Sequence, residues 1–440
     1  MNMALLHHKS AECCKTELDV FSIPPTQTQI QRGAWVSYLP TTNITDTGAI
    51  EFQIQPSDDA IDLHNTQLYV RVKVVNGDGS ALGDDAAVAP CNLFFQALFE
   101  QIDVYVSNRL ISGGTNTYPY RAYLETLLNY DEDAKNSWLA AELWHSDTPG
   151  RMDNLYQLPA PNAALLNDGW VRRNAYVKNS ASFEMKGGLH IDLLHQDRYM
   201  LNNTSLRFRF LRSKNAFSLL SGEASPNYKV VIEEAVLYIR KTALSPAVQL
   251  GYAQALQRAT AKYPITRVEI KTFSIATGTW NINRDNIFLG TLPRRMVLGL
   301  VDSAAFNADY SKNPFNFQHF NTNFLGVYID GEQLPFKPFE PNFAAGRYID
   351  SYLTLCSCSE KGGNAITREA YPKGFTLWVF DFTPDLGCSD HLNLIRQGNL
   401  RVELRFSQAL TTSVNCIILA EFDNILEVDK DRNVIYDYTS

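Results

Sequence analysis

The sequence predicts an all-β protein made of two tandem β-sandwiches, because its second half repeats short patterns of its first half in the same order. The offset between copies is roughly 190–230 residues, the size of a domain and far too long for a solenoid repeat. Short strands and long irregular insertions also favour sandwiches. Four patterns recur: Phe95-Gln96 as Phe317-Gln318, Val104-Tyr105-Val106 as Val327-Tyr328-Ile329, Tyr123-Leu124 as Tyr352-Leu353, and Asp192-Leu193 with Leu206–Phe210 as Asp385-Leu386 with Leu400–Phe406.

Strands of the first sandwich are predicted where polar and apolar residues alternate, as in a sheet with one buried face. An extended segment over 17–25 precedes them, because Pro24-Pro25 cannot continue a helix or a central strand. The predicted strands cover residues 35–38, 50–54, 68–74, 102–106, 205–211 and 229–240.

Two segments have helical rather than strand periodicity. The first, 120–144, has apolar residues near helical spacing and is broken around Asp131-Glu132-Asp133. The second, 245–260, begins with Ser245 as N-cap and Pro246 at the first helical position, and Tyr263-Pro264 should stop it. This helix falls where the two repeats meet, so we interpret it as a connector.

Strands of the second sandwich follow the same reasoning. Residues 307–314 and 336–347 are predicted as irregular loops, the latter because Pro338 and Pro341 oppose regular structure. Antiparallel strands with long crossing connections fit jelly rolls, although periodicity alone also allows an immunoglobulin-like sandwich. The predicted strands cover 266–274, 295–301, 324–329, 375–380, 400–406 and 414–422.

Composition limits the classes of function. The net charge of −8 and the pI of about 5.6 argue against nonspecific nucleic-acid binding by the body of the protein. No stretch reaches the ~20 apolar residues of a membrane span, and the first 15 residues lack a secretory core. We therefore expect intracellular synthesis without a signal peptide, and the seven cysteines should be reduced thiols.

Catalytic signatures are missing from the sequence, which predicts a protein that is not an enzyme and has no cofactor or small-molecule substrate. Two weak metal candidates have simpler explanations. The loop 76–85 offers oxygen ligands for calcium but lacks the closing Glu, so a hairpin loop is favoured. Cys356-Ser357-Cys358 lacks a second ligand pair, so two small residues on a strand are favoured.

The strongest candidate cluster is His190-Ile191-Asp192 with His195 and Asp197. On a strand, His190 and Asp192 would share a face and could hold a metal. A strand end whose His and Asp side chains make hydrogen bonds is the commoner arrangement. We therefore predict no catalytic, cofactor or metal residue in the chain.

Arginines alternate along two predicted strands that echo each other, and such rows could meet phosphate. Cross-strand ion pairs are the simpler explanation, with Glu233, Glu234, Glu403 and Glu421 as possible partners. The arginines are Arg207, Arg209 and Arg212 in the first strand and Arg401 and Arg405 in its echo.

Six stretches of the sequence are similar to those of one known family: 18–28 (LDVFSIPPTQT), 116–123 (NTYPYRAY), 196–202 (QDRYMLN), 261–265 (AKYPI), 312–317 (KNPFNF) and 421–424 (EFDN). On these stretches, and over about residues 17–438, the chain resembles the double jelly-roll major capsid proteins of Polinton (Maverick) elements and adintoviruses. The first 16 residues lie outside this resemblance.

The resemblance implies a fold, an assembly and a location. It implies jelly rolls over 17–244 and 263–440; from the sequence itself we expect a flexible arm over 1–16 and a connecting helix or linker over 245–262. Three subunits would form a homotrimeric, pseudo-hexagonal capsomer of an icosahedral shell, so the protein would reside in the virion. Neighbouring capsomers and a penton or minor capsid protein are the expected partners. Whether a membrane lies under the shell is left open.

Two aromatic loops are difficult to explain as solvated segments. We predict that they are buried in subunit contacts, through Phe315, Phe317, Phe320, Phe336, Phe339 and Phe343.

Two alternatives stay open. A minor or vertex capsid protein is disfavoured by the duplicated length. A two-domain β-sandwich carbohydrate-binding protein or enzyme would need an exposed aromatic row or a facing pair of carboxylates.

Overall fold

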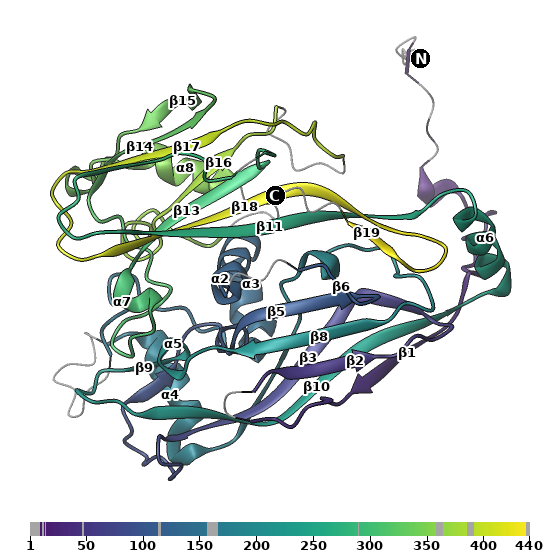
Figure 1. Cartoon of the computed structure of the whole chain (residues 1–440), viewed down its shortest axis with the longest axis horizontal. Helices are drawn as coiled ribbons and strands as arrows, with labels where there is room; N and C mark the ends of the chain where they lie inside the picture. Colours follow the sequence, from purple (N-terminus) through teal and green to yellow (C-terminus); the bar gives the residue numbers. More distant parts are fainter. Residues whose placement is uncertain are drawn as a thin grey trace, which may run out of the picture.

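A computed structural model describes residues 9–10, 13, 15–45, 48–112, 116–155, 166–288, 290–357, 364–384 and 391–436, without the side chains of 334–336 and 436. None of the helices it describes combines the length and apolarity that a membrane crossing requires. Figure 1 shows two β-sandwiches one above the other, with helices between them.

The first sandwich consists of two four-stranded sheets. Apolar residues point inward at every second position, as in the buried Ile50, Phe52 and Ile54 of β2. One sheet has the order β1 (Ile30–Tyr38), β10 (Tyr228–Leu244), β3 (Ala60–Asn76) and β7 (Phe183–Gly187). The other has the order β2 (Ile50–Ile54), β8 (Leu206–Arg212), β5 (Phe99–Val106) and β6 (Arg109–Leu110).

The second sandwich repeats this arrangement strand for strand. One sheet has the order β11 (Ala261–Ile275), β18 (Val414–Val428), β13 (Arg295–Asp302) and β16 (Leu377–Asp381), with β19 (Val434–Tyr436) added beside β18. The other has the order β12 (Asn281–Arg284), β17 (Leu400–Phe406), β14 (Thr322–Ile329) and β15 (Glu332–Phe339).

The two sheet orders match under one mapping, in which β1, β3, β5, β8 and β10 correspond to β11, β13, β14, β17 and β18. In each sandwich the first long strand pairs with the last, so the chain closes on itself as a jelly roll does. The repeat seen in the sequence is therefore a repeat of the fold, and the jelly-roll topology replaces the immunoglobulin-like alternative.

Short helices and one small ribbon connect the strands. The ribbon pairs β4 (Val88–Pro90) with β9 (Leu219–Ser221). The α-helices are α1 (Phe94–Ala97), α2 (Tyr118–Asn129), α3 (Glu132–Asn136), α4 (Asp168–Val177), α5 (Asn215–Ser218), α6 (Pro246–Leu256), α7 (Ser303–Phe306) and α8 (Ile349–Ser357). The 3-10 turns are η1 (Thr16–Leu18), η2 (Trp138–Glu142), η4 (Lys178–Ser180), η5 (Asp192–Leu194) and η6 (Phe343–Ala345).

The helical predictions are partly confirmed. The segment predicted over 120–144 is helical but divided into α2, α3 and η2, with the break at Asp131, whose side chain caps α3. The helix after Ser245 is α6, which ends at Leu256 rather than near 260. Ser245 precedes it without a side-chain cap, so the predicted N-cap bond is wrong.

Two predictions were wrong because they assumed that proline excludes a strand. Pro264 lies inside β11, and Pro338 lies inside β15, where a loop was expected over 336–347. Both strands are sheet edges, where a missing N–H need not break a ladder. The loop after Asn76 is not a hairpin, because β3 and the next strand, β4, belong to different sheets.

Helix α2 lies between the two jelly rolls, and ten of its twelve residues are buried (Figure 1). Its ring of Tyr123 stacks on Phe315 of the second half, with centroids 4.1 Å apart and an interplanar angle of 1°. Tyr120 stacks on Phe306, also from the second half, at 5.6 Å. One hydrophobic cluster therefore continues from the first jelly roll into the second.

The repeat supplies a matched pair of leucines that tests how deeply α2 is buried. Leu124 in α2 is 1% exposed, whereas its echo Leu353 in α8 is 55% exposed. Leu124→Ala should lower the free energy of unfolding by about 2–5 kcal/mol, because it opens a cavity in the core. Leu353→Ala should change it by less than about 0.5 kcal/mol. Thermal and denaturant unfolding measure both, and equal effects would contradict the placement of α2.

Candidate functional site

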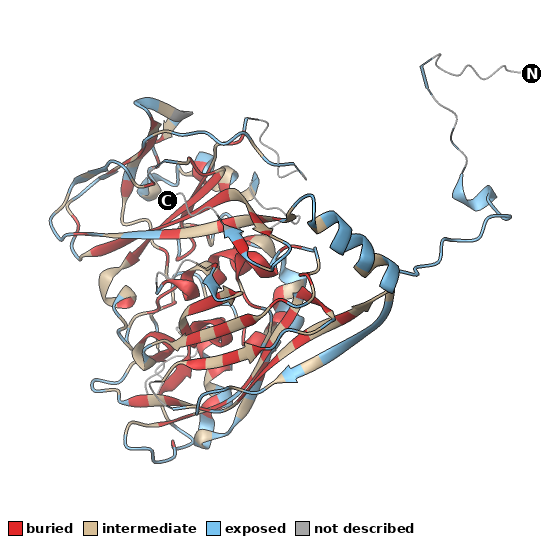
Figure 2. Ribbon diagram, turned by 45° about the vertical axis from the view of Figure 1, so that its right-hand side comes forward, coloured by how far each residue is buried: buried red, intermediate tan, exposed pale blue. Residues whose placement is uncertain are grey.

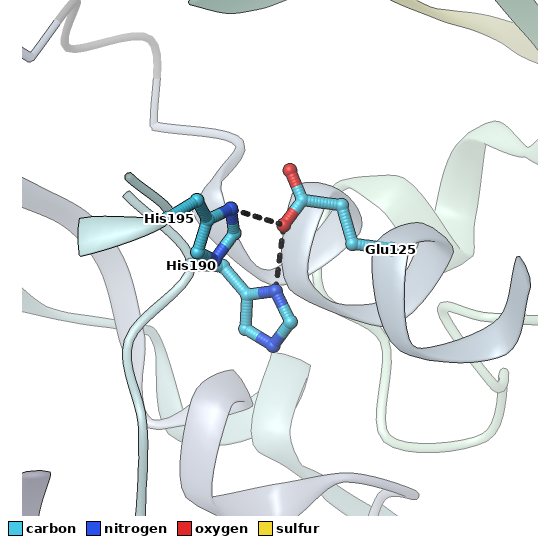
Figure 3. Close-up of side chains that lie close together, drawn as sticks. All are labelled: Glu125, His190 and His195. Carbon is cyan, nitrogen blue, oxygen red and sulfur yellow. Dashed lines mark hydrogen bonds and ion pairs between the residues drawn. The ribbon is translucent and has the colours of Figure 1, made fainter. Parts of the chain in front are cut away.

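A polar cluster lies where α2 meets the loop that joins β7 to η5. Glu125 extends from α2 toward two imidazole rings (Figure 3). Its Oε2 is 2.6 Å from Nδ1 of His190 and 4.0 Å from Nδ1 of His195. Glu125 and His190 are largely buried, and His195 is about half exposed. The sequence places His190 and His195 on either side of the single 3-10 turn η5.

The loop that carries His190 is held by α2 and α1. The backbone N–H of His190 donates to the Tyr118 hydroxyl at 3.1 Å, and this hydroxyl donates to Gln96 Oε1 at 2.5 Å. Gln96 Nε2 donates to Glu142 Oε2 at 2.7 Å and to the Gly188 carbonyl at 2.9 Å. A continuous chain of buried hydrogen bonds therefore fixes the position of the imidazole.

Arg121 connects this cluster to the second jelly roll. It lies one helical turn before Glu125 and donates from Nε to Glu125 Oε1 at 2.8 Å. Its Nη2 is 2.7 Å from Asp192 Oδ1, and that oxygen accepts the backbone N–H of Val268 in β11 at 3.2 Å. We call the group Arg121, Glu125, His190 and Asp192 the polar joint, since these residues of the first jelly roll bind the second through Val268.

The surroundings lower the pKa of one carboxyl group, Glu125, and raise the pKa values of two others, Asp192 and Glu142. Burial favours the neutral form of Glu125, but the charge of Arg121 and the hydrogen bond to His190 outweigh it and hold the pKa well below its usual value. Burial raises the pKa of Asp192, although Arg121 opposes the shift. Burial also raises the pKa of Glu142 to about 7.

Glu125, His190 and His195 are the described residues whose donor atoms come close enough for a metal, all within 4.8 Å. The cluster is nevertheless poorly suited to a cation. Arg121 already places a positive charge on Glu125, and both ring nitrogens of His190 have partners, Glu125 and the Thr126 hydroxyl at 3.3 Å. The arrangement thus pairs the carboxylate of Glu125 with Arg121 and His190.

Part of this cluster was predicted from the sequence, but the predicted secondary structure around it was wrong. His190 and Asp192 do not share a strand, because the chain turns into η5 at Asp192. Asp197 lies apart on the surface, 3.7 Å from His64. Sequence reasoning missed Arg121 and Glu125, although their spacing of four residues on a predicted helix was a usable signal.

A second buried ion pair joins the jelly rolls further along the interface. Arg173 Nη2 in α4 is 2.6 Å from Asp147 Oδ1, and both side chains are almost fully buried. Asn313 of the second half donates from Nδ2 to Asp147 Oδ2 at 2.8 Å and from its backbone to Asp153 Oδ1 at 2.7 Å. Asn316 donates to Asp153 Oδ2 at 2.8 Å. None of these pairs was predicted from the sequence.

Most arginines of the two rows contact residues of their own sheet, whereas Arg212 donates to the carbonyls of Thr45 and of Val230 in β10, a strand of the other sheet. Arg209 lies opposite Glu51 and Asp103 on the neighbouring strands, at 3.4 and 3.7 Å, which confirms cross-strand ion pairing at this position. Arg207 lies over the ring of its cross-strand partner Tyr105 at 4.0 Å, and its echo Arg401 lies over Tyr328 at 4.2 Å. The same cation–π pair therefore occurs in both jelly rolls.

The expected glutamate partners are mostly wrong. Glu233 and Glu234 pair with Arg71, and Glu421 pairs with Arg295 at 2.5 Å. Only Glu403 pairs with a predicted arginine, Arg405, in the same strand at 2.6 Å.

The weak metal candidates find no support. Cys356 lies in helix α8 as a free thiol rather than on a strand, and Cys358 lies outside the described residues. In the loop after β3, Asp78 accepts hydrogen bonds from the backbone and hydroxyl of Ser80 at 2.8 and 2.7 Å.

The aromatic loops are largely buried within this chain. Phe315 and Phe317 lie in the core between the jelly rolls, and Phe339 lies in the core of the second. Phe320 is half-buried, and the half-buried Phe343 stacks on His319 at 4.1 Å. The side chain of Phe336 lies outside the described residues. The predicted role of these six residues in subunit contacts stays a prediction.

Comparisons with known proteins show which fold this is. No family model matches the chain. An uncharacterized protein of Caenorhabditis elegans is 23% identical over 433 residues, which cover 94% of this chain and 99% of the nematode protein.

Solved capsid structures share the fold at low sequence identity. A chain of the Sputnik virophage has a TM-score of 0.64 at 12% identity, covering 100% of this chain and 96% of its own length. The mavirus major capsid protein has a TM-score of 0.57 at 10% identity, covering 99% and 96%. A chain of the PBCV-1 virus capsid has a TM-score of 0.57 at 11% identity, covering 96% and 100%. The predicted fold class, two tandem jelly rolls, is confirmed.

Opposite pKa shifts predict opposite effects of two conservative substitutions. The folded state binds the Glu142 proton more tightly than the unfolded state does, so stability is lost as pH rises from about 4.5 through 7. Glu142→Gln imitates the protonated form. At pH 8 it should raise the free energy of unfolding by up to about 3 kcal/mol, and Tm with it, whereas at pH 5 it should change both very little.

Glu125→Gln is the matched control, because the Glu125 pKa is lowered and its ionised form is bound in the fold. This variant should lower the free energy of unfolding by about 3 kcal/mol. The loss should be present at pH 8 as well as at pH 5, since Glu125 stays ionised in the folded state over that window. If Glu142→Gln gave the same gain at both values, the assignment of the raised pKa would be wrong.

We expect that the polar joint does not bind a metal ion and that the Tm of the protein does not depend on one. A cation that binds only the folded state raises Tm in proportion to the logarithm of its concentration. Adding Zn²⁺, or removing metals with EDTA, should therefore leave Tm unchanged. A Zn²⁺-dependent rise that His190→Ala abolishes would overturn this interpretation.

Proposed function

We propose that this chain is the major capsid protein of an icosahedral shell, built from trimeric, pseudo-hexagonal capsomers. One observation carries the proposal: the same eight-stranded sheet order occurs twice in one chain. Three such chains contain six sandwiches, and six similar units around a threefold axis make a tile with nearly sixfold shape. The likeness to the Sputnik, mavirus and PBCV-1 capsid chains supports the same conclusion.

A closed trimer needs two different complementary faces on each subunit. We expect an interface of about 2,000 Å² or more, partly apolar. Phe320 and Phe343 are half-buried and have surface left for such a contact. Neighbouring capsomers and a penton or minor capsid protein complete the proposed set of partners, and the virion is the proposed location.

We assign the parent element to the Polinton (Maverick) and adintovirus group, on the stretches of sequence that resemble its capsid proteins. Several of these stretches make contacts between the jelly rolls. Asn313 of the 312–317 stretch binds Asp147, and Tyr263 of the 261–265 stretch accepts the Leu201 N–H at 3.1 Å. The division into an arm, two jelly rolls and the connector at 245–262 is part of the same proposal.

The described clusters favour a structural role over catalysis, because their carboxylates are paired with arginine or amide partners. The duplicated jelly roll disfavours a vertex protein. Of the described tryptophans, the exposed Trp35 lies in β1, Trp138 in η2 and Trp280 just before β12, so they give little support for a glycan-binding aromatic row.

Light scattering on a sizing column tests the proposal. The expected mass is near three times 49.6 kDa, and negative-stain microscopy of the same peak should show pseudo-hexagonal particles. A stable monomer over a range of salt and protein concentrations would contradict the trimer and would direct attention to glycan binding instead.

A further inference from the structure

Helix α6 is an apolar helix on the surface. Its sequence, PAVQLGYAQAL, contains no charged residue, yet none of its residues is buried. Leu250 and Tyr252 are about half exposed or more, and Figure 2 shows the whole helix at the edge of the molecule. A surface helix normally turns a polar face to water. This one therefore exposes a face suited to contact with another apolar segment.

A groove of about 500 Å³ runs beside this helix. Apolar parts of Leu201, Tyr252, Ala255, Leu256, Ala259 and Tyr263 line it. Its floor is fixed, because the Tyr263 hydroxyl accepts the Leu201 N–H at 3.1 Å and donates to the Tyr199 carbonyl at 3.3 Å. Arg198 closes one side through a bond to the Lys262 carbonyl at 2.6 Å. The groove is thus preformed.

The segment 16–23 has the complementary character. Leu18, Val20, Phe21 and Ile23 are 71–94% exposed, a density of exposed apolar side chains that usually marks a contact site. The segment has local order, since it begins with η1 and Asp19 accepts the backbone N–H of Ser22 at 3.1 Å. Glu17 and Asp19 give it negative charge. The charged residues that line the groove are Arg198, Lys262 and Asp197, and Lys262 also pairs with Glu427 at 2.7 Å.

We call the segment 16–23 the docking arm, as distinct from the predicted arm over 1–16. Its position bears on whether it fills the groove of its own chain or the groove of another copy. The Ser245 N–H donates to the Gln29 carbonyl at 2.8 Å, so the base of the arm is attached at the start of α6. Pro24-Pro25 keeps the chain extended, at about 3.1 Å per residue. The chain leaves α6 and runs away from the body in both views (Figures 1 and 2), and the apolar residues of 18–23 are exposed rather than packed on their own chain.

We propose that the arm residues 18–23 of one subunit dock in the α6 groove of a neighbouring copy. Phe21 would supply the main apolar contact, and Glu17 and Asp19 would face Arg198 and Lys262. The inference rests on the proposed function and deepens it, because it names the segment and the groove by which copies are joined. Passing one arm to the next subunit is a heterologous contact, as a closed ring requires.

Site-specific photocrosslinking tests the docking. The full chain carries p-benzoylphenylalanine at position 21 and is irradiated at a concentration where light scattering has measured its mass. We expect a product of two chains, with the cross-link mapped to 197–201 or 246–263. The same probe at Leu394, an equally exposed apolar residue elsewhere, is the control and should not label the groove. Ala255→Arg, at an exposed position, should reduce the two-chain product at least tenfold.

The outcomes separate this inference from the proposed function. A monomeric mass contradicts the capsomer. A multimer that gives only cross-links within one chain, or none to the groove, contradicts the arm docking alone. Flotation with vesicles of phosphatidylcholine and phosphatidylserine that Phe21→Asp abolishes, without a two-chain product, would mean that the arm binds a membrane and would overturn the inference. A two-chain product insensitive to Ala255→Arg would also overturn it.

Discussion

The burial of α2 between two jelly rolls is the constraint on which the rest of the structure depends. One helix carries the aromatic contacts of Tyr120 and Tyr123 on the second half and also the charges of Arg121 and Glu125. Apolar stacking gives most of the attraction, because it removes large rings from water. The ion pairs fix the relative orientation of the packed elements, because the buried charges have partners in only one arrangement. Together they hold the two sandwiches as one body.

Two polar groups hold the interface at separate places, and they differ in composition. The polar joint uses Arg121 between Glu125 and Asp192, and it reaches the second jelly roll through one backbone N–H of β11. The other group uses Arg173 with Asp147 and reaches across through Asn313. Contacts at two separate places resist rotation as well as separation. A fixed angle between the sandwiches is what the proposed trimeric capsomer would need.

The sequence predicted most of the fold, because strand alternation and internal repetition are local or self-similar signals. The strands β2 and β17 were predicted to the residue. The edge strands β11 and β15 were harder to predict from the sequence. Pro264 and Pro338 are tolerated there because no neighbouring strand needs the missing N–H, and a strand's place in the sheet is not a local signal. The site was found only in part: His190 and Asp192 stand close in the sequence, but Glu125 meets them through packing over more than sixty residues. The aromatic loops were predicted to be buried in subunit contacts, but the chain itself buries Phe315, Phe317 and Phe339.

The duplicated jelly roll matters for function only if the two copies keep a fixed relation. The measurement that tests this most directly is pulsed dipolar spectroscopy between spin labels carried on noncanonical residues at Asp58 and Lys271, exposed positions in different jelly rolls. A single narrow distance distribution, unchanged between isolated protein and assembled particles, is the expected result. A broad or bimodal distribution would show that the jelly rolls move independently and would contradict the account of one rigid tile.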